Sequence, residues 1–459
     1  MSAEASDMSS WLLMGIPGLV FITGLADAFF TVLSLGIGTY LNWLFVTRRL
    51  RRYTMRVNAV TIPEFFSKRY YDKRNILMCI SAIIILIFFV PYTAAGFKAV
   101  GTLLESLFGF PYHESMVVGA AIVVLYTVMG GFMAVSTTDL IQSIVMSIAL
   151  VVIVCFGISL AGGIDQVTGT VSQLDGYFSL TELRNGDSGE AEPYGIITII
   201  STMAWGLGYF GMPHILLRFM AIKREEDIKL SRRIATVWVF ISMFVAIGIG
   251  FIGYAVAQQH FIPDFQTASE AERIIIEMAN LLAQHGVIAA LVAGVVLAGI
   301  LACTMSTADS QLLTAASSFS ENILRDVCGV KVSANTSMLI ARGTIIVIAL
   351  LGMYLAWNPE SSIFQIVSFS WAGFGGAFGP VMLASLFWRR TTLAGAISGM
   401  VAGGIMVFVW KFLVRPLGGA CNIYELLPAF VVATVAIIIV SLCTEKPSQK
   451  ILDDFDYAK

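Results

Sequence analysis

Residues 203–220 read MAWGLGYFGMPHILLRFM, an apolar stretch interrupted by three glycines and by Pro213. A second stretch, SDMSSWLLMGIPGLVFITG at 6–24, begins with polar residues and is interrupted by two glycines and Pro17. Proline lacks a backbone donor and breaks the helical hydrogen-bond ladder. In hydrocarbon, the freed backbone groups need other partners. Each stretch could be an ordinary packing kink, so their positions in the chain have to decide between packing and function.

The composition indicates a membrane protein. Of 459 residues, 57% are hydrophobic and 13% are charged, whereas soluble domains carry about 25% charged residues. Apolar runs long enough to cross about 30 Å of hydrocarbon recur throughout the chain. They are long, helix-type runs, which predicts an all-α polytopic bundle and not a barrel. About twelve transmembrane segments are predicted, at 9–24, 27–47, 75–103, 115–135, 139–162, 193–220, 233–258, 285–323, 338–357, 363–388, 392–413 and 425–444.

Several other classes of protein are disfavoured. The longest polar gaps, 163–193 and 259–284, are too short for an appended soluble or signalling domain. The six cysteines form no CxxC motif, the four histidines are far apart, and no HExxH motif occurs. We therefore expect no enzyme activity and no cofactor apart from a coupling ion. The net charge of −2 indicates no nucleic-acid partner.

Lysines and arginines are distributed unevenly along the chain. Most lie in the gap at 48–74, in the stretch from Arg218 to Arg233, and in later gaps on the same side if the segments alternate. Short loops rich in Lys and Arg stay in the cytoplasm. We therefore expect both termini to be cytoplasmic and the acidic loop 163–193 to lie outside.

The two interrupted segments are the first and the sixth, so they are equivalent members of two five-segment halves. Because each half crosses the membrane five times, the halves have opposite orientations. Corresponding broken helices in inverted repeats indicate a transporter binding site at the membrane midplane. The repeats are inferred from this crossing count, since the halves share little residue-level similarity. The predicted parts are a first repeat 1–163, a second repeat 193–388, peripheral helices 392–444 and a cytoplasmic tail 445–459.

The eighth segment contains LACTMSTADSQLL at 301–313, which is unusually polar for its depth. Helical spacing places several small polar side chains on one face. Such a stripe either joins helices or supplies oxygen ligands to a hard cation, and spacing alone favours the first. The stripe comprises Cys303, Thr307, Ser310, Thr314 and Ser317, with Ser306 beside it.

Three carboxylates lie in or beside these apolar segments. Asp309, on the flank of the stripe, is the strongest indication of function among them. Inserting an ionisable residue into a membrane segment costs about 2.5–3.5 kcal/mol, and such a residue usually marks the path of a substrate or ion. Asp139 either caps a helix or belongs to a site. Asp7, with Ser9 and Ser10, can cap the half-helix that follows. The N-terminus of that half-helix would suit an anionic group of a substrate.

Four stretches together resemble the sodium/solute symporter family, over essentially the whole chain and in the same order. They are SAEASDMSSWLLMGIPG (2–18), WGLGYFGMPHILLRFM (205–220), MSTADSQLL (305–313) and SWAGFGGAFGP (370–380). The second is typical of the proline-transporting branch. The resemblance implies a LeuT-like 5+5 inverted-repeat bundle with two extra C-terminal helices. It also implies sodium-coupled import of L-proline by alternating access. The expected protein is a monomer embedded in the lipid of a bacterial cytoplasmic membrane.

The resemblance also implies a sodium site built from three backbone carbonyls and two hydroxyls. These oxygens belong to Ala5, Met8, Cys303, Ser306 and Thr307. In this family Asp7 supports sodium affinity without being an evident ligand. Some members bind a second sodium ion between the fifth and eighth segments, where this chain has Asp139 and Ser310 beside Ser306.

The substrate pocket implied by the resemblance comprises Ser9, Ser10, Tyr92, Trp205, Tyr209 and Pro213. Two aromatic rings four residues apart could enclose a small apolar ring, although spacing alone favours bundle packing. A glycine-rich run in the tenth segment is expected to act as a gate or hinge, or to allow close helix packing. That run comprises Gly373, Gly375, Gly376, Gly379 and Pro380.

The chain departs from the family at two places. Ser10 stands where proline-transporting members have glycine, and the family has a further helix and a half upstream of residue 2. We therefore expect a fragment or a misplaced start, and poor transport by the chain as written. The alternatives are import of another small solute and a proton-driven cycle. A channel would need a continuous polar pore, which the broken helices do not suggest.

Overall fold

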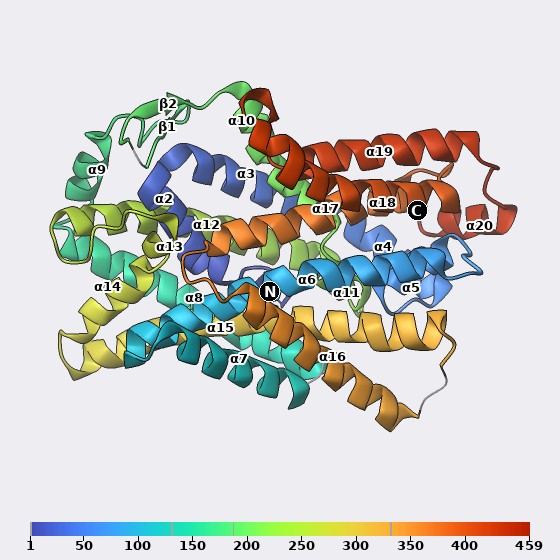
Figure 1. Cartoon of the computed structure of the whole chain (residues 1–459), viewed down its shortest axis with the longest axis horizontal. Coiled ribbons are helices and arrows are strands. Elements are labelled where there is room, and N and C mark those ends of the chain that lie inside the picture. Colours follow the sequence, from blue (N-terminus) through green and yellow to red (C-terminus); the bar gives the residue numbers. More distant parts are fainter. Residues whose placement is uncertain (1, 130–131, 187, 331–332) are drawn as a thin grey trace.

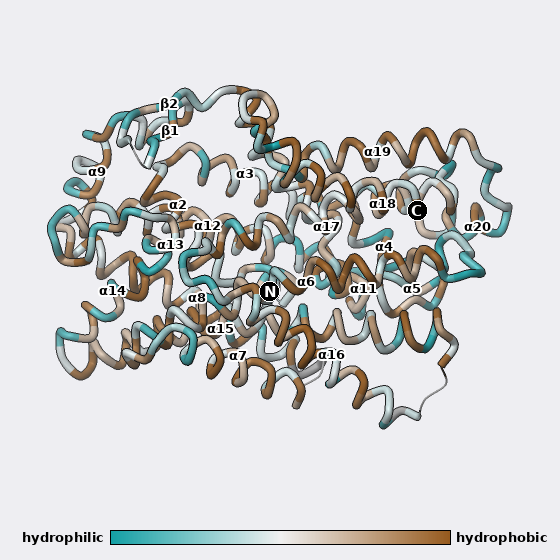
Figure 2. The backbone as a smooth tube through the Cα atoms, in the orientation of Figure 1, coloured by the Kyte–Doolittle hydropathy of each residue, from teal (hydrophilic) through white to brown (hydrophobic). Residues whose placement is uncertain are grey.

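The computed structural model describes residues 2–129, 132–186, 188–330 and 333–459. The molecule is an elongated bundle of helices that run roughly side by side (Figure 1). Apolar residues cover the long helices, and polar residues gather towards the loops (Figure 2). The predicted all-α fold is confirmed, with a small addition in the acidic loop. That addition is a helix and a two-stranded antiparallel hairpin, α9 (Ile164–Ser172), β1 (Glu182–Arg184) and β2 (Ala191–Pro193).

Within the described residues, ten helices are long and apolar enough to cross a membrane. Three of them continue through short π or 3-10 turns. The ten are α3 (Leu25–Leu41) with η2 (Asn42–Val46) and α4 (Thr47–Val57), α6 (Ile76–Phe108), α7 (Tyr112–Met129), α8 (Phe132–Leu160), α12 (Asp227–Gln258), α15 (Val287–Ser317) with η4 (Ser318–Val327), α16 (Ala334–Leu355), α17 (Ile363–Phe387), α18 (Leu393–Val409) with η5 (Trp410–Val414) and η6 (Arg415–Leu417), and α19 (Leu426–Cys443).

The two broken segments account for the difference from the predicted twelve. The sixth comprises α10 (Ile196–Met203), the 3-10 helix η3 (Ala204–Phe210) and α11 (Pro213–Met220), and it bends by 41°. Counted as one span, it raises the number to eleven. The first comprises α1 (Ser2–Ala5), the π-helical η1 (Trp11–Gly15) and α2 (Ile16–Thr23). Its apolar helix, Trp11–Thr23, is shorter than a full span because the polar break at 6–9 interrupts the segment.

Helix α17 forms the centre of the bundle, where it packs against α6, η3, α18 and α19. All five residues of its predicted gate are buried. A Cβ atom at Gly375 would come within 2.8 Å of the Gly208 Cα atom, and one at Gly373 would overlap the ring of Phe88. The glycine run therefore permits close packing against η3 and α6, and its role as a hinge stays a prediction.

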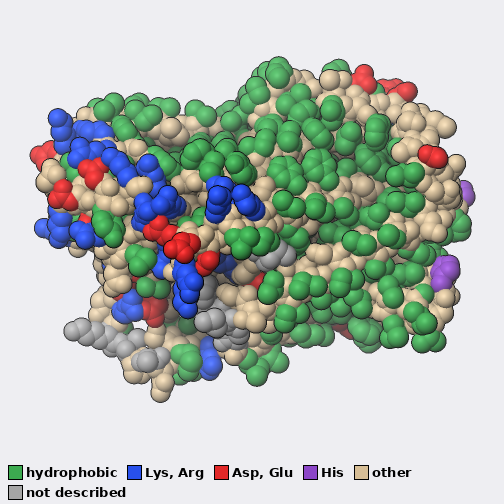
Figure 3. All heavy atoms as spheres, turned by 180° about the vertical axis from the view of Figure 1, so that it is seen from behind, with side chains coloured by type: hydrophobic (Ala, Val, Ile, Leu, Met, Phe, Trp, Pro, Cys, Tyr) green, Lys and Arg blue, Asp and Glu red, His purple; other side chains and the backbone are tan. Residues whose placement is uncertain are grey.

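Basic residues gather at one end of the molecule, where α4, α5 (Ile62–Arg69) and the C-terminal α20 (Gln449–Tyr457) meet (Figures 1 and 3). Asp454 of α20 accepts hydrogen bonds from Arg56 Nε at 2.9 Å and from the Tyr71 hydroxyl. In the nearby loop, hydrogen bonds from Arg52 and Arg48 lower the pKa of Glu225 below its ordinary value. The C-terminal tail thus lies at the same end as the 48–74 segment.

The opposite end is closed by a helical hairpin, α13 (Ala268–Ala271) and α14 (Ile274–Ala283). Between its two helices, the Glu272 carboxylate caps the N-terminus of α17. It accepts hydrogen bonds from the Ser362 hydroxyl at 2.8 Å and from the Ile363 amide at 3.1 Å. Lys98 of α6 lies 3.8 Å from the same carboxylate. This contact ties the hairpin, α17 and α6 together.

The contact between α3 and η3 depends on two glycines. A Cβ atom at Gly38 would overlap the carbonyl oxygen of Gly206. We predict that Gly38→Ala destabilises the protein by about 1–3 kcal/mol, because overpacking forces the backbones apart. Gly248→Ala in α12 is the matched control, since its Cβ atom would meet no heavy atom within 4 Å. Thermal unfolding in detergent measures both, and equal melting temperatures would contradict the prediction.

Candidate functional site

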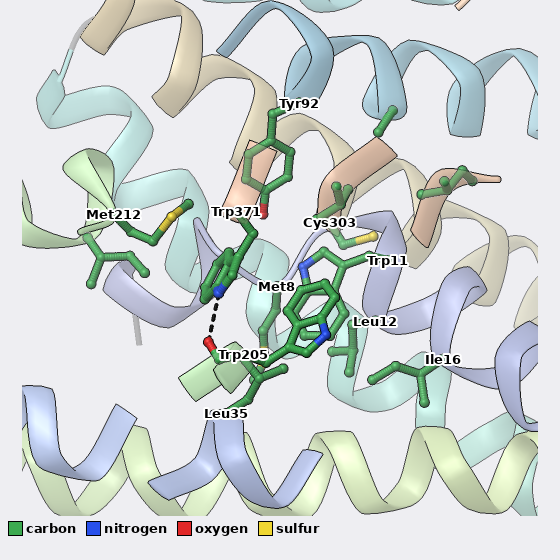
Figure 4. Close-up of a cluster of buried hydrophobic side chains, with 14 of the residues drawn as sticks. Met8, Trp11, Leu12, Ile16, Leu35, Tyr92, Trp205, Met212, Cys303 and Trp371 are labelled. Atoms are coloured by element: carbon green, nitrogen blue, oxygen red, sulfur yellow. Dashed lines mark hydrogen bonds between the residues drawn. The ribbon is translucent and has the colours of Figure 1, made fainter. Parts of the chain in front are cut away.

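The break in the first segment exposes backbone groups inside the bundle. Between α1 and η1, residues 6–9 leave the helical path. The amides of Asp7 and Met8 donate back to the Glu4 carbonyl at 3.1 and 2.8 Å. The Trp11 indole donates to the Asp7 carbonyl at 2.9 Å. These local contacts hold the polar run SDMSS in a fixed, non-helical shape next to Cys303 of α15 (Figure 4).

Helix α15 meets this break through its hydroxyl groups. The Ser306 hydroxyl lies 2.9 Å from the Ala5 carbonyl and 3.0 Å from the Cys303 carbonyl. Thr307, the next residue, is buried and its hydroxyl has no hydrogen-bond partner. The structure therefore brings Ala5, Cys303 and Ser306 into direct contact. Met8 lies in the same buried cluster.

Helix η3 carries the two aromatic residues predicted to contact a substrate. A 3-10 helix turns once in about three residues, so side chains four residues apart do not lie on one face as they would in an α-helix. Instead, both rings lie beside Trp371 of α17. Tyr209 contacts it edge-on at 5.1 Å, and the Trp371 indole donates to the Trp205 carbonyl at 2.8 Å. The Trp205 ring stacks on Tyr424 at 5.0 Å.

Asp7 connects these aromatic residues to the broken helix. The Tyr209 hydroxyl donates to its Oδ2 at 2.7 Å, and the Tyr92 hydroxyl lies 3.4 Å from its carbonyl. Ser9 and Ser10 follow Asp7; both are buried, and neither hydroxyl has a hydrogen-bond partner. Five of the six predicted substrate residues therefore lie around Asp7 or beside Trp371. The sixth, Pro213, is buried at the start of α11.

Asp139 lies in a different environment, because it is paired with a cation. Arg218 Nη2 is 2.7 Å from Asp139 Oδ2 and also 2.7 Å from the Ser310 hydroxyl. Ser2 donates to the same carboxylate oxygen at 2.7 Å. Arg218 was counted among the basic residues of a cytoplasmic gap, but its side chain is only 8% exposed within the bundle. Asp309 is next to this group, since its Oδ1 lies 3.2 Å from the Ser310 hydroxyl.

A cavity of about 550 Å³ leads to this ion pair from the basic end of the molecule. Its wall includes Arg51 and residues 59–61 near that end, and Arg218 and Ser310 farther in. Ser310 donates to the Ser306 carbonyl at 2.8 Å. Ser310 thus connects the wall of this cavity to Ser306.

Sequence reasoning missed several residues that complete the site. Trp371 was quoted within a motif but given no role, and Tyr424 lies far from the broken segments in the sequence. Glu4 is an ionisable residue within the first motif, and this is the signal that could have identified it. It is buried, and its Oε1 accepts a 2.7 Å hydrogen bond from the Trp43 indole.

Comparisons with known proteins agree with this architecture. The sequence profile of the Sodium:solute symporter family matches residues 1–403. The chain is 39% identical to the osmoregulated proline transporter OpuE of Bacillus subtilis, over 98% of this chain and 87% of that protein. It is also 39% identical to the sodium/proline symporter of Escherichia coli, over 98% of this chain and 86% of that protein.

Solved structures show the same fold. A Na+-coupled sialic acid symporter, in a substrate-bound outward-open state, aligns with a TM-score of 0.77 at 18% identity, over 98% of this chain and 90% of that one. Mhp1, a nucleobase-cation-symport-1 family transporter, aligns in its closed conformation with a TM-score of 0.56 at 14% identity, over 99% and 95% of the two chains. The fold is thus a LeuT-like helical bundle. The chain belongs to the sodium:solute symporter family.

The buried Asp139–Arg218 pair generates a prediction about stability. Removing one partner of such a pair leaves an uncompensated charge and costs about 3–5 kcal/mol. We expect Arg218→Gln and Asp139→Asn each to lower the melting temperature in detergent substantially. The double variant should recover much of the loss, because neither charge remains. Additive losses in this double-mutant cycle would show that the two side chains do not interact.

Proposed function

We propose that this chain is a sodium-coupled symporter that imports L-proline by alternating access across a bacterial cytoplasmic membrane. The observation that carries the proposal is the contact of Ser306 with the Ala5 and Cys303 carbonyls. It joins a broken helix of one half to the polar stripe of the other, which is where inverted-repeat transporters bind their ions. Relatives named as sodium/proline symporters support the choice of ion and substrate.

The proposed sodium site uses the five predicted oxygens. Sodium is a hard cation and prefers oxygen ligands. In the described geometry the Ser306 hydroxyl donates to one of two nearby carbonyl oxygens. A sodium ion would draw both carbonyls and the Ser306 oxygen onto itself, together with the unpartnered Thr307 hydroxyl and the Met8 carbonyl. Because Cys303 would contribute only its carbonyl, its thiol has no part in binding. Asp7 would support affinity through its charge.

The proposed substrate pocket lies across the break from this ion. The Trp205 and Tyr209 rings can enclose the pyrrolidine ring of proline, with Tyr92 and Pro213 completing the apolar wall. Ser9 and Ser10 precede η1, so their unpartnered hydroxyls and the following amides can receive the substrate carboxylate. Because the Tyr209 hydroxyl already contacts Asp7, substrate binding and sodium affinity are coupled through one residue.

Alternating access would use both ends of the bundle. The 550 Å³ cavity at the basic end is the proposed inward path. The Glu272 cap on α17 closes the other end. We propose that α17 moves with its glycine run as the hinge, between repeats 1–163 and 193–388. Segments 392–444 would take no part in this movement. The basic end and the tail 445–459 would face the cytoplasm. The protein would act as a monomer.

A second sodium ion at Asp139 and Ser310, beside Ser306, would need a change in the structure. The Arg218 guanidinium contacts both Asp139 and Ser310 at 2.7 Å. A sodium ion could use these oxygens only after that guanidinium had moved, because two cations at one carboxylate repel each other.

The energetics suit uptake of a neutral zwitterion. One charge moving through about 100 mV releases about 2.3 kcal/mol. A tenfold sodium gradient adds about 1.4 kcal/mol. Together they would support roughly 500-fold accumulation with one sodium ion per proline.

Uptake into proteoliposomes tests the proposal. We expect any accumulation of radiolabelled proline to require an inward sodium gradient, and Thr307→Ala to raise the half-saturating sodium concentration by at least about tenfold, equivalent to about 1.4 kcal/mol. Thr434→Ala, in α19, is the control, because its hydroxyl bonds only to the Phe430 carbonyl of its own helix in the described structure. Uptake of another solute from a panel, or uptake driven by a proton gradient alone, would favour the alternatives.

The aromatic pocket makes a separate prediction. Trp205→Ala should raise the KM for proline by about tenfold or more, because it removes a buried ring from the substrate wall. Its effect on the sodium requirement should be smaller. Trp357→Ala is the matched control, since that ring is 53% exposed at the surface. An unchanged KM in Trp205→Ala would exclude this residue from the pocket.

A further inference from the structure

The connection that leads from α18 to α19 reaches the central helix α17. Tyr424 lies in this connection, just before α19, and is only 7% exposed. Its ring stacks on the Trp205 ring of η3, with 5.0 Å between the ring centroids. Its hydroxyl donates to the Ser368 carbonyl of α17 at 2.6 Å, and its amide donates to the Ser201 hydroxyl of α10 at 2.6 Å. One residue thus contacts α10, η3 and α17.

Contacts within the hairpin formed by α18 and α19 hold this connection in place. Glu425, the residue after Tyr424, is 0% exposed, and its carboxylate forms an ion pair with Arg415 Nη1 at 2.9 Å. On the other side, the Trp410 indole donates to the Ile423 carbonyl at 3.2 Å. The backbone on both sides of Tyr424 is therefore attached to η5 and η6.

The Trp205 ring has two further aromatic neighbours, and both belong to α17. Phe364 lies at 5.2 Å and Trp371 at 6.1 Å between ring centroids, with their planes tilted by 34° and 36°. The Tyr424 ring is closer to parallel, at 19°. In the proposed cycle α17 moves, whereas the hairpin that carries Tyr424 does not. Tyr424 is therefore the fixed partner of the Trp205 ring.

We propose that Tyr424 limits the size of the substrate ring that the pocket accepts, because it prevents the Trp205 ring from withdrawing. This inference rests on the proposed function, in which Trp205 encloses the pyrrolidine ring of proline. Overpacking a well-packed site forces side chains from their preferred positions and is destabilising. A Trp205 ring that cannot withdraw thus admits a five-membered ring and disfavours a larger one. Tyr424 is a positioning residue, since it acts through Trp205.

Binding selectivity tests this inference. Dissociation constants of L-proline and of L-pipecolate, its homologue with a six-membered ring, are measured on the purified full chain at saturating sodium. We expect the wild type to bind pipecolate at least about tenfold more weakly, which is the usual effect of one methylene group in a closely fitting pocket.

Tyr424→Ala should change both affinities. The lost stacking should weaken proline binding by about three- to tenfold. The space left behind Trp205 should also reduce the difference between proline and pipecolate to about threefold or less. If this variant does not fold, Tyr424→Leu decides, because it replaces the ring by a buried aliphatic side chain.

Two further variants separate selectivity from general packing. Tyr424→Phe keeps the ring and loses only the hydroxyl group, so it should keep the selectivity of the wild type. Tyr112→Ala is the matched control. Tyr112 is 5% exposed, and its hydroxyl donates to the Ala356 carbonyl at 2.7 Å, which joins α7 to the end of α16. Its loss should lower the melting temperature and leave the selectivity unchanged.

A double-mutant cycle shows whether Tyr424 acts through Trp205. When Trp205→Ala is already present, Tyr424→Ala should have little further effect on proline affinity, because the stacked pair is already lost. Additive losses in the cycle would overturn this inference.

The other possible failures can be told apart. Unchanged selectivity in Tyr424→Ala, or selectivity lost equally in Tyr424→Phe, would overturn this inference and leave the proposed function intact. A wild type that binds pipecolate as tightly as proline would do the same. A wild type that does not bind proline, or unchanged proline affinity in Trp205→Ala, would overturn the proposed pocket itself.

Discussion

The contact of the Ser306 hydroxyl with the carbonyls of Ala5 and Cys303 is the interaction on which the candidate site depends. A backbone break in hydrocarbon survives only if its freed groups find partners. Here part of that need is met by a side chain of α15. The same oxygens are of the kind that hard cations prefer, so the contact that stabilises the break also suits the proposed ion site.

Charge compensation explains how four acidic groups are accommodated near that break. Asp139 is neutralised by Arg218, and Asp309 lies beside that pair through Ser310. Glu4 and Asp7 are accommodated differently, by hydrogen bonds from the Trp43 indole and the Tyr209 hydroxyl.

Much of the architecture follows from the sequence, because hydrocarbon thickness fixes segment length and the breaks coincide with proline and glycine. The helices at all twelve predicted positions exist, and Ser306 lies against the first break as the family motif implies. The 3-10 winding of 204–210 could not be predicted, since it depends on the close approach of Gly206 to α3. The pairing of Arg218 with Asp139 could not be predicted, because a basic residue near a segment end looks the same in the sequence whether it faces water or a buried carboxylate. Trp371 and Tyr424 reach the pocket only through tertiary packing.

The docked C-terminal helix has a practical consequence for anyone handling the protein. Lys459 lies over the ring of Phe455, and that ring in turn covers the buried guanidinium of Arg69. Asp456 binds both Lys459 and Arg389, the latter just beyond the end of α17. A purification tag fused directly to the last residue would therefore pull on contacts that reach the central helix. A flexible spacer, or a tag inserted in the exposed loop around residue 190, would leave them undisturbed.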